Sequence, residues 1–557
     1  MPQLIQLLRF LTRMSSSGGR AQIAAAVTAG VLGGATSAAL VGLINTALED
    51  GPRPGWLLPA FLALCLVLPL FRFLATFLLL RLVERAQFDL RMELSRRILS
   101  TPLRRIEEVG AHRLLATLTD DVGNIVAAFA YLPLLLMHVT VLAGCLAYMG
   151  WLSWKLLLLV LGFLVFGVIC YQFPMRRAQH YFRLVREAWD RQFRQFRSLT
   201  EGIKELKLHR PRRQAFIEDE LVATGRERMR YRIRATVVHS LAGSWGQVLF
   251  FLLIGLILFG APRANGTDLR ILVGFTLAIL YMLTPLDVLL NMAPALNAGA
   301  VALRQVEGLG LSLASGAEPE GVDEAGDAGW RSLDLVGVTC AYHKETEDDT
   351  FTLGPIDLAL RPGECVFLVG GNGSGKTTLA KVITGLYVPD LGEIRLDGRP
   401  IGDAERETYR QLFSTVFSDF YLFERLLGHD AGRIDGQARH YLEKLHLHRK
   451  VRIQDGVFST IDLSQGQRKR LALLSVYLED RPIYLFDEWA ADQDPTFKEI
   501  FYRQLLPELK ARGKTAIVIS HDDRYFGVAD RVVKLEDGRL VQYQPERRSQ
   551  LAATALA

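Results

Sequence analysis

The chain has 557 residues, of which 50% are hydrophobic, with a mean hydropathy of +0.18 and a formal net charge of +6 at pH 7. This length exceeds one ordinary domain, and this hydrophobic content is too high for an ordinary soluble chain. A single-domain soluble protein is therefore excluded. The apolar residues gather in the first 300 positions, whereas residues 330–545 have the pattern of a soluble α/β domain.

The opening segment, residues 1–14, precedes the first long apolar run. Its apolar residues have helical spacing, but it has neither a long apolar core nor a small-residue cleavage site. We therefore expect an interfacial helix rather than a signal peptide.

Six mostly apolar runs follow, and each is long enough to cross a bilayer as a helix of about 20 residues. For the short run at 152–173, a buried core helix is the alternative. Taken together, the runs predict a polytopic α-helical membrane domain with six transmembrane helices over residues 1–308. The expected spans are 21–46, 56–82, 126–150, 152–173, 237–260 and 271–297.

Arginines are concentrated in two long connections, 83–125 and 174–236, whereas the other connections are short and carry few. Because Lys and Arg near span ends stay on the cytoplasmic side, both chain termini are expected in the cytoplasm. The same arrangement explains the positive net charge without a nucleic-acid partner. The helices should continue beyond the bilayer and turn near 101–122 and 198–213, where they can contact a cytoplasmic domain.

Few polar groups lie within the expected spans, and each is a candidate for function because an ionisable group is costly in lipid. Arg72 and Asp287 are the first candidates for contact with a transported molecule. The alternative is that they pair with each other, or that Arg72 extends towards the interface. The remaining polar groups are His138, His239, Gln247 and Asn291.

Residues 309–329 are small and acidic with no periodicity, which predicts a linker before a soluble domain over 330–557. In that domain, VFLVGGNGSGKTTL places an apolar strand before a glycine-rich loop and a helix. This spacing predicts backbone N–H groups that bind the phosphates of a nucleoside triphosphate, with Lys376 reaching the β- and γ-phosphates and Thr377 binding Mg²⁺. The candidate nucleotide-binding residues here are Asn372, Gly373, Ser374, Gly375, Lys376, Thr377 and Thr378.

The stretch IDLSQGQRKRLALL, residues 461–474, has Ser464 in the position of a helix N-cap. The backbone N–H groups of Gly466 and Gln467 would then lie at the positive end of a helix, which binds anions. An ordinary capped helix is the alternative.

The stretch YLFDEWAADQDP, residues 484–495, places Asp487 and Glu488 at the end of an apolar strand. A nucleotide hydrolase with a phosphate loop needs an acid there to hold Mg²⁺, and Asp487 fits this role. Glu488 would then be the general base or the group that orients the attacking water. Adjacent carboxylates are often only solvated, but the upstream phosphate loop favours the catalytic interpretation.

The order of these motifs resembles that of ATP-binding cassette (ABC) exporters, in which a membrane domain precedes one cassette. LSQGQ is similar to the family signature, and IVISHD follows the acidic strand in the family's order. The resemblance implies a six-helix membrane domain fused to an α/β P-loop ATPase cassette.

The resemblance also implies roles for single residues. Tyr342 would stack on adenine, Asp494 would signal across a dimer, and His521 would contact the γ-phosphate. In this family the signature of one cassette closes over ATP bound to the other, which implies a homodimer of two half-transporters. The signature residues of this chain are Ser464, Gly466 and Gln467.

One position departs from the family pattern. Where most cassettes have a glutamine, the stretch TVFSDFYLF has Ser418. A hydroxyl can reach Mg²⁺ or water, although it is shorter than an amide side chain. We expect Ser418 to keep a polar role in metal binding or hydrolysis.

Three stretches, FSDFYLF, LSQGQRKRLALL and LFDEWAADQDP, resemble one branch of the family, the cyclic-peptide exporters of Gram-negative bacteria. This branch includes pyoverdine-precursor, syringomycin-type lipopeptide and microcin exporters. The resemblance implies ATP-driven export of an amphipathic peptide across the bacterial inner membrane by alternating access. A lipid or multidrug exporter of the same architecture is the alternative, and an ATP-gated channel or regulator is a third interpretation. Whether such an exporter uses a periplasmic or outer-membrane partner stays an open question.

Overall fold

The chain forms two compact units. The first comprises residues 1–93 and 116–308, and the second comprises residues 94–115 and 309–557. The expected interfacial helix at 1–14 and residues 315–328 of the expected linker lie outside the described residues, and the expected domain boundaries stay predictions. The computed structural model describes residues 17–48, 54–260, 268–314, 329–343, 350–428 and 431–542.

Among the described residues, six helices are long and apolar enough to cross a membrane. This confirms the predicted membrane domain with six transmembrane helices. The six extend over Ala21–Ala47, Leu57–Leu99, Ala111–Leu152, Trp154–Glu201, Arg210–Gly260 and Leu269–Leu309.

The longest of these helices extend well beyond the thickness of a bilayer. Helix α8 has 48 residues, which at about 1.5 Å per residue gives a length of about 72 Å, roughly twice the hydrocarbon core. Its first half is apolar and its second half is rich in arginine, so only the first half suits lipid. The helices of this part are α2 (Ser17–Ala47), α3 (Leu57–Leu99), η1 (Thr117–Asp121), α6 (Val122–Ala130), α7 (Leu132–Leu152), α8 (Trp154–Glu201), α9 (Ile203–Leu208), α10 (Arg210–Ala215), η2 (Phe216–Val222), α11 (Ala223–Gly255), η3 (Leu256–Gly260) and α13 (Leu269–Ala314).

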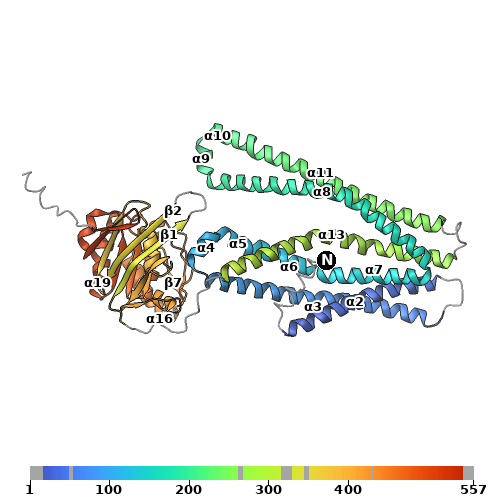
Figure 1. Cartoon of the computed structure of the whole chain (residues 1–557), viewed down its shortest axis with the longest axis horizontal. Helices are drawn as coiled ribbons and strands as arrows, with labels where there is room; N and C mark the ends of the chain where they lie inside the picture. The colour runs from blue at the N-terminus through green and yellow to red at the C-terminus, as the bar shows by residue number, and fades with distance from the viewer. Residues whose placement is uncertain are drawn as a thin grey trace, which may run out of the picture. The chain divides into compact units, whose positions relative to one another are not determined.

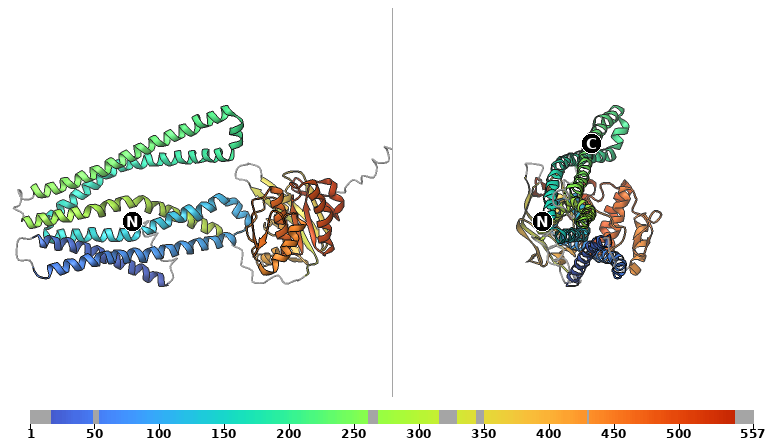
Figure 2. Two further views of the ribbon diagram at one scale, coloured as in Figure 1. Left: turned by 180° about the vertical axis from the view of Figure 1, so that it is seen from behind. Right: turned by 90° about the vertical axis from the view of Figure 1, so that its right-hand side faces the viewer.

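Helices α8 and α11 run side by side and are joined at one end by α9 and α10 (Figure 1, Figure 2). Polar contacts hold the arginine-rich parts together. Arg191 forms an ion pair with Glu227 at 2.6 Å, and the Arg228 guanidinium lies 4.1 Å from the centre of the Trp189 ring. These contacts offset the repulsion between the arginines of the two helices, so the helices stay in contact outside the apolar region.

The second unit contains the soluble α/β domain. Its main sheet has six strands in the order β12-β11-β3-β10-β9-β6, and all neighbouring pairs are parallel except β11 with β12. Strands β9 and β10 are buried along their whole length, which explains their unbroken apolar sequences. The strands of this sheet are β3 (Cys365–Gly370), β6 (Phe413–Val416), β9 (Ile483–Asp487), β10 (Thr515–Ile519), β11 (Arg531–Glu536) and β12 (Arg539–Gln542).

Two smaller sheets and a set of helices complete this unit. The antiparallel sheet has the strand order β2-β1-β4-β5, and β7 pairs with β8. Their strands are β1 (Leu333–His343), β2 (Thr350–Leu360), β4 (Leu391–Leu396), β5 (Arg399–Pro400), β7 (Ile453–Gln454) and β8 (Val457–Phe458). The helices are α4 (Leu103–Val109), α5 (Ala111–Ala116), α14 (Lys376–Ile383), α15 (Arg406–Arg410), α16 (Ala431–Lys444), α17 (Gln465–Glu479), α18 (Pro495–Ile500), η4 (Phe501–Leu505), α19 (Leu506–Ala511) and η5 (Asp523–Val528).

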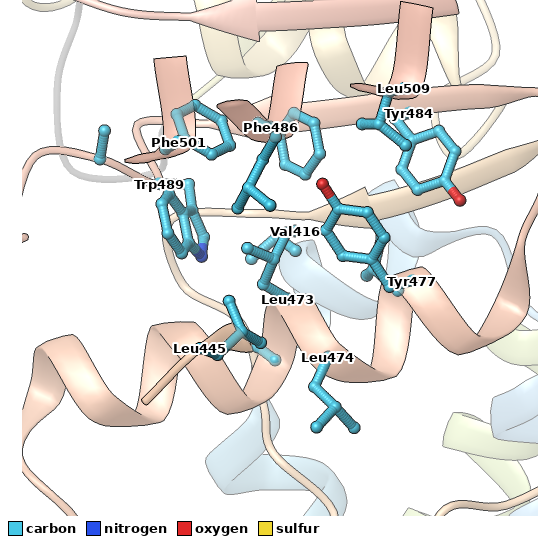
Figure 3. Close-up of a cluster of buried hydrophobic side chains, with 14 of the residues drawn as sticks. Val416, Leu445, Leu473, Leu474, Tyr477, Tyr484, Phe486, Trp489, Phe501 and Leu509 are labelled. Carbon is cyan, nitrogen blue, oxygen red and sulfur yellow. The ribbon is translucent and has the colours of Figure 1, made fainter. Parts of the chain in front are cut away.

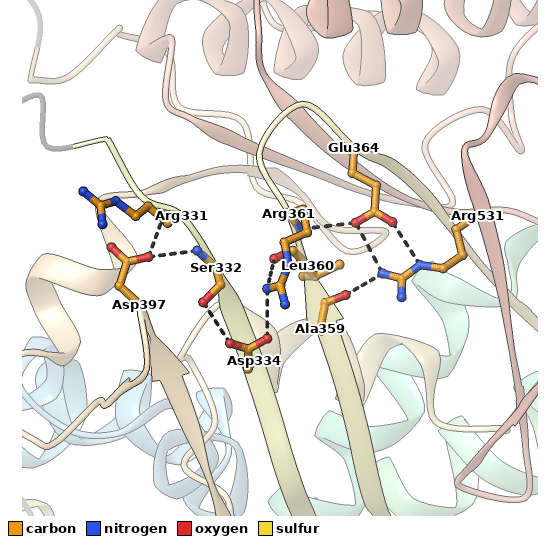
Figure 4. Close-up of polar contacts among 9 residues, drawn as sticks. All are labelled: Arg331, Ser332, Asp334, Ala359, Leu360, Arg361, Glu364, Asp397 and Arg531. Carbon is orange, nitrogen blue, oxygen red and sulfur yellow. Dashed lines mark hydrogen bonds and ion pairs between the residues drawn. The ribbon is translucent and has the colours of Figure 1, made fainter.

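Polar contacts connect the antiparallel sheet to the main sheet (Figure 4). Arg531, at the start of β11, pairs with Glu364 at 3.0 Å and also donates to the Ala359 carbonyl of β2. Near the same edge, Arg361 pairs with Asp334 of β1 at 3.0 Å. Arg531 thus joins the residue before the phosphate-loop strand β3 to strand β2 of the antiparallel sheet.

Helix α4, from the first predicted turn, packs on the soluble domain within the second unit. Arg104 forms an ion pair with Asp390 at 2.8 Å, and the Lys381 ammonium donates to Glu107 at 2.8 Å. The Tyr387 hydroxyl donates to the same Glu107 carboxylate. The prediction that the turn at 101–122 contacts the soluble domain is confirmed for α4, whereas the role of the 198–213 turn stays a prediction.

Candidate nucleotide site

The glycine-rich loop lies between β3 and α14, as the sequence predicts. Gly375 has φ +98° directly before α14, and a Cβ atom there would lie 2.8 Å from the Phe351 ring. Only glycine fits both demands. Asn372 and Gly373 are exposed, so their backbone is accessible at the N-terminal end of a helix, where phosphate binds.

Lys376, the first residue of α14, turns back over this loop. Its buried ammonium donates to the carbonyl oxygens of Gly370 at 3.1 Å and Gly371 at 2.8 Å. Burial lowers the pKa of Lys376 below its ordinary value, against the opposing effect of the carboxylates of Glu488 and Asp487. Phosphate oxygens in the loop would offer this ammonium charged acceptors in place of neutral carbonyls.

Asp487 is fully buried at the end of β9 and is the centre of a set of oxygen groups. Its Oδ2 accepts hydrogen bonds from Thr377 at 3.0 Å and from Ser418 at 3.1 Å. Its Oδ1 has no hydrogen-bond partner among the described residues. Burial raises the pKa of Asp487 above its ordinary value, against the two hydroxyl groups, which lower it.

This oxygen set fits Mg²⁺. The ion prefers carboxylate and hydroxyl oxygens, and an unpartnered buried carboxylate oxygen is a suitable ligand for it or for one of its waters. A divalent cation would also stabilise the ionised carboxylate that burial disfavours. Asp487, Thr377 and Ser418 are therefore the residues that would hold the metal.

Glu488 follows Asp487 and has a left-handed backbone conformation with φ +49°. Its Oε1 lies 3.2 Å from Nε2 of His521, which follows β10. Both side chains line a cavity of about 340 Å³, together with Ser520 and Lys498. The cavity gives the Glu488 carboxylate access to water, which a general base requires.

The signature segment lies at the N-terminal end of α17. Ser464 has an extended backbone and is exposed, as is Gln465. The Ser464 N–H donates to the Gln467 side chain at 3.4 Å, so the segment forms a capped helix start. The accessible end of this helix can bind an anion from another surface.

Two further predicted residues, Tyr342 and Asp494, lie on other elements than Asp487 and Glu488. Tyr342 lies in β1 opposite Phe351, and its side chain is outside the described residues. Asp494 caps α18, because its Oδ1 accepts from the Phe497 N–H at 2.9 Å.

Sequence reasoning missed one part of this site. Lys469, Trp489 and Gln493 join the signature helix to the segment after β9 through hydrogen bonds. Lys469 stands between two arginines in the sequence, where a lysine is usually exposed, so its burial was not predictable. Trp489, a large apolar residue directly after the two acids, was the available sign of a buried contact in this segment.

Two of the polar candidates of the membrane part, Asp287 and Asn291, bond to each other. Asn291 donates to Asp287 Oδ1 at 3.1 Å, one helical turn away on α13. Among the described residues, no ion pair joins Arg72 to Asp287. Beside this turn, Leu286 and Leu290 line a small apolar cavity of about 60 Å³ with residues of α8 and α11.

Comparisons with known proteins show the family of the chain. A model described as "ABC transporter" matches residues 353–491, and a model of the ABC transporter transmembrane region matches residues 21–286. The ATP-binding protein SyrD of Pseudomonas syringae pv. syringae is 39% identical over 525 residues, which cover 92% of each chain. This chain belongs to the ABC exporter family. The exporter is a multi-pass membrane protein that binds ATP in its cassette and couples ATP hydrolysis to transport.

The relatives of the exporter also include a lipid flippase and a solved exporter structure. An ATP-dependent lipid A-core flippase of Dechloromonas aromatica is 29% identical over 503 residues, covering 86% of this chain and 83% of the flippase. A solved structure, a bacterial Atm1-family ABC exporter with ATP bound, has a TM-score of 0.72 and 18% identity, with 95% of each chain covered. This last likeness shows that the fold is shared.

Proposed function

We propose that this exporter moves a cyclic or modified peptide across the bacterial inner membrane, with both termini in the cytoplasm. The three cassette stretches that resemble cyclic-peptide exporters carry the proposal. The chain is 39% identical to SyrD and 29% identical to a lipid A-core flippase, which supports a closer relationship to SyrD than to this flippase. Lipid export is the second candidate, because several flippases match most of the chain.

The working unit in this proposal is a homodimer. Each chain carries one phosphate loop and one signature segment, and Ser464 is exposed at the N-terminal end of α17. The signature of one chain would close over ATP held by the loop of the other, which uses both surfaces in a symmetric pair.

The candidate residues divide the chemistry of hydrolysis between them. Lys376 and the loop N–H groups would hold the phosphates, and His521 would contact the γ-phosphate. Asp487, Thr377 and Ser418 would hold Mg²⁺, which neutralises charge on the phosphate oxygens. Glu488 would accept the proton of the attacking water, and Tyr342 would stack on adenine.

The contacts of α4 connect this chemistry to transport. Arg104 and Glu107 are held by charged and hydroxyl groups of the cassette, and α4 follows α3 directly in the chain. Closure of the two cassettes would therefore move the end of α3, as alternating access requires.

The test is ATPase stimulation and flux by the full-length protein in lipid discs, with cyclic lipopeptides, siderophore precursors and phospholipids compared. We expect stimulation by a cyclic peptide and none by phospholipid. Stimulation by phospholipid alone would transfer the assignment to lipid export. Flux without ATP turnover would instead indicate an ATP-gated channel.

Replacing Asp287 with asparagine is expected to raise the peptide concentration at half-maximal stimulation by roughly 10- to 100-fold. A hydrogen bond to a charged group contributes about 1.5–3 kcal/mol, and this carboxylate is exposed on a membrane-spanning helix, where a transported molecule can reach it. The control is Asp268→Asn, just before α13 and outside the spans. An unchanged half-maximal concentration would exclude Asp287 from substrate binding.

Replacing Ser418 with alanine is expected to lower ATP turnover about tenfold. The hydroxyl donates to Asp487 Oδ2 at 3.1 Å, and a hydrogen bond to a charged group contributes about 1.5 kcal/mol. Initial rates of phosphate release measure the effect, with Ser475→Ala in α17 as the control. If ATP turnover and transport are both unchanged, Ser418 has no role in hydrolysis.

A further inference from the structure

We propose that Lys469 is a positioning residue for Glu488, and that it joins the signature helix of a cassette to the hydrolytic carboxylate of the same cassette. The inference rests on the proposed roles of Glu488 and of the signature segment. It assigns a function to the lysine of LSQGQRKR and to the tryptophan of FDEWAADQ.

The Lys469 ammonium is buried and contacts the segment after β9. The side chain is 4% exposed, although it lies on a helix that begins at the surface. Its Nζ donates to the Glu488 carbonyl oxygen at 3.1 Å and pairs with Asp492 Oδ2 at 2.7 Å. A charge is costly to bury unless it is paired, so both contacts are needed to keep it there.

The carbonyl that Lys469 holds belongs to a strained residue. Glu488 has φ +49°, a left-handed conformation that is uncommon for a residue with a side chain. Its N–H donates to Ile519 at 3.2 Å, and its carbonyl also accepts from the Ala491 N–H at 3.2 Å. These bonds and the Lys469 ammonium hold the peptide on both sides of Glu488, which directs its carboxylate towards His521.

Trp489 forms the return contact. Its indole N–H donates to the Lys469 carbonyl at 2.7 Å. The Lys469 side chain in turn donates to the carbonyl of Glu488, the residue before Trp489. The ring is 1% exposed and lies 4.5 Å from the Phe501 ring. Figure 3 shows the indole beside Phe501 with its nitrogen directed towards α17. Packing therefore fixes the donor in place.

A third contact lies closer to the signature itself. The Gln493 amide donates to the Gly466 carbonyl at 3.0 Å, and a Cβ atom at position 466 would lie 3.1 Å from the Asp492 carbonyl. The first turn of α17 and residues 488–493 are thus one connected piece. Because the signature would bind the partner's ATP while Glu488 acts on its own, this piece would transmit the state of one ATP site to the other.

The test compares Lys469→Met with the unaltered full-length dimer in lipid discs. Methionine keeps the apolar length of the side chain and removes its donors. We expect kcat for ATP hydrolysis to fall by roughly 10- to 100-fold, because a catalytic group misplaced by about 1 Å loses this much. The KM for ATP should stay within about twofold, since the phosphate loop is untouched. A merely structural role would instead raise KM and lower kcat together.

Two further variants make the result decisive. Lys444→Met removes an ammonium paired with Glu508 elsewhere on the cassette, and it should leave kcat unchanged. Trp489→Phe keeps an aromatic ring but removes the N–H, and it should lower kcat at unchanged KM even if Lys469→Met does not fold. An unchanged kcat in Trp489→Phe, or in a folded Lys469→Met, would overturn the inference.

A background variant separates this inference from the proposed function. In Glu488→Gln, the additional change Lys469→Met should cause no further loss of hydrolysis, because the carboxylate it positions is gone. If Glu488→Gln alone hydrolyses ATP normally, the proposed role of Glu488 fails first. If Glu488→Gln is impaired and Lys469→Met is not, only the inference fails.

Discussion

Replacing Glu488 with glutamine is expected to lower steady-state ATP hydrolysis by about 10²- to 10⁴-fold, which is the usual contribution of a general base. The amide keeps the size of the side chain but accepts no proton from water. The carboxylate lies 3.2 Å from His521 and is partly exposed beside a cavity of about 340 Å³. Because the amide has the same size, the substitution should leave the fold unchanged.

The same variant should still bind ATP, because the phosphate loop and Lys376 are unaltered. We expect it to accumulate as a closed dimer with ATP retained, which retention of labelled nucleotide after rapid gel filtration measures. Glu499→Gln is the control, since that carboxylate pairs with Arg503 on the cassette surface. Normal steady-state turnover in Glu488→Gln would remove the assignment of Glu488 as base.

Replacing Asp487 with asparagine is expected to lower hydrolysis by about 10²-fold or more at a fixed Mg²⁺ concentration. Charge stabilisation by a catalytic metal amounts to several kcal/mol, and this buried carboxylate contacts both Thr377 and Ser418. Hydrolysis measured across a Mg²⁺ titration should show a shift to higher metal concentration.

The stability of this variant distinguishes loss of metal from loss of fold. Burial raises the pKa of Asp487, so its ionised form costs stability when no cation is bound. Asparagine removes that cost and keeps an oxygen that can accept from the two hydroxyl groups. The metal-free variant should therefore melt at a Tm no lower than that of the unaltered protein. A clearly lower Tm would mean that the loss of activity reports misfolding.

The membrane helices and the phosphate loop were predictable because each depends on neighbouring residues. An uncharged run of about 20 residues suits only a membrane or a core, whatever it packs against. The expected span 152–173 is the apolar half of α8, and the glycine at 375 has the positive φ that its place before Lys376 requires.

The contact between Ser418 and Asp487 depends on sheet topology. These residues are 69 positions apart, and they meet because β6 pairs with β9 in parallel, which places the ends of both strands together. The family resemblance indicated the position of Ser418, but its hydrogen bond to the carboxylate required the strand order.

By itself, the sequence determined the two kinds of domain and the six spans, and it predicted the candidate residues of the nucleotide site. Only the tertiary structure decided that Lys469 is buried on Glu488 and Asp492, and that Asp287 bonds to Asn291 rather than to Arg72. The physical reason is that motifs act through bonds to near neighbours in the chain. Burial and the partner of a charged side chain depend on which distant segments the fold brings to it.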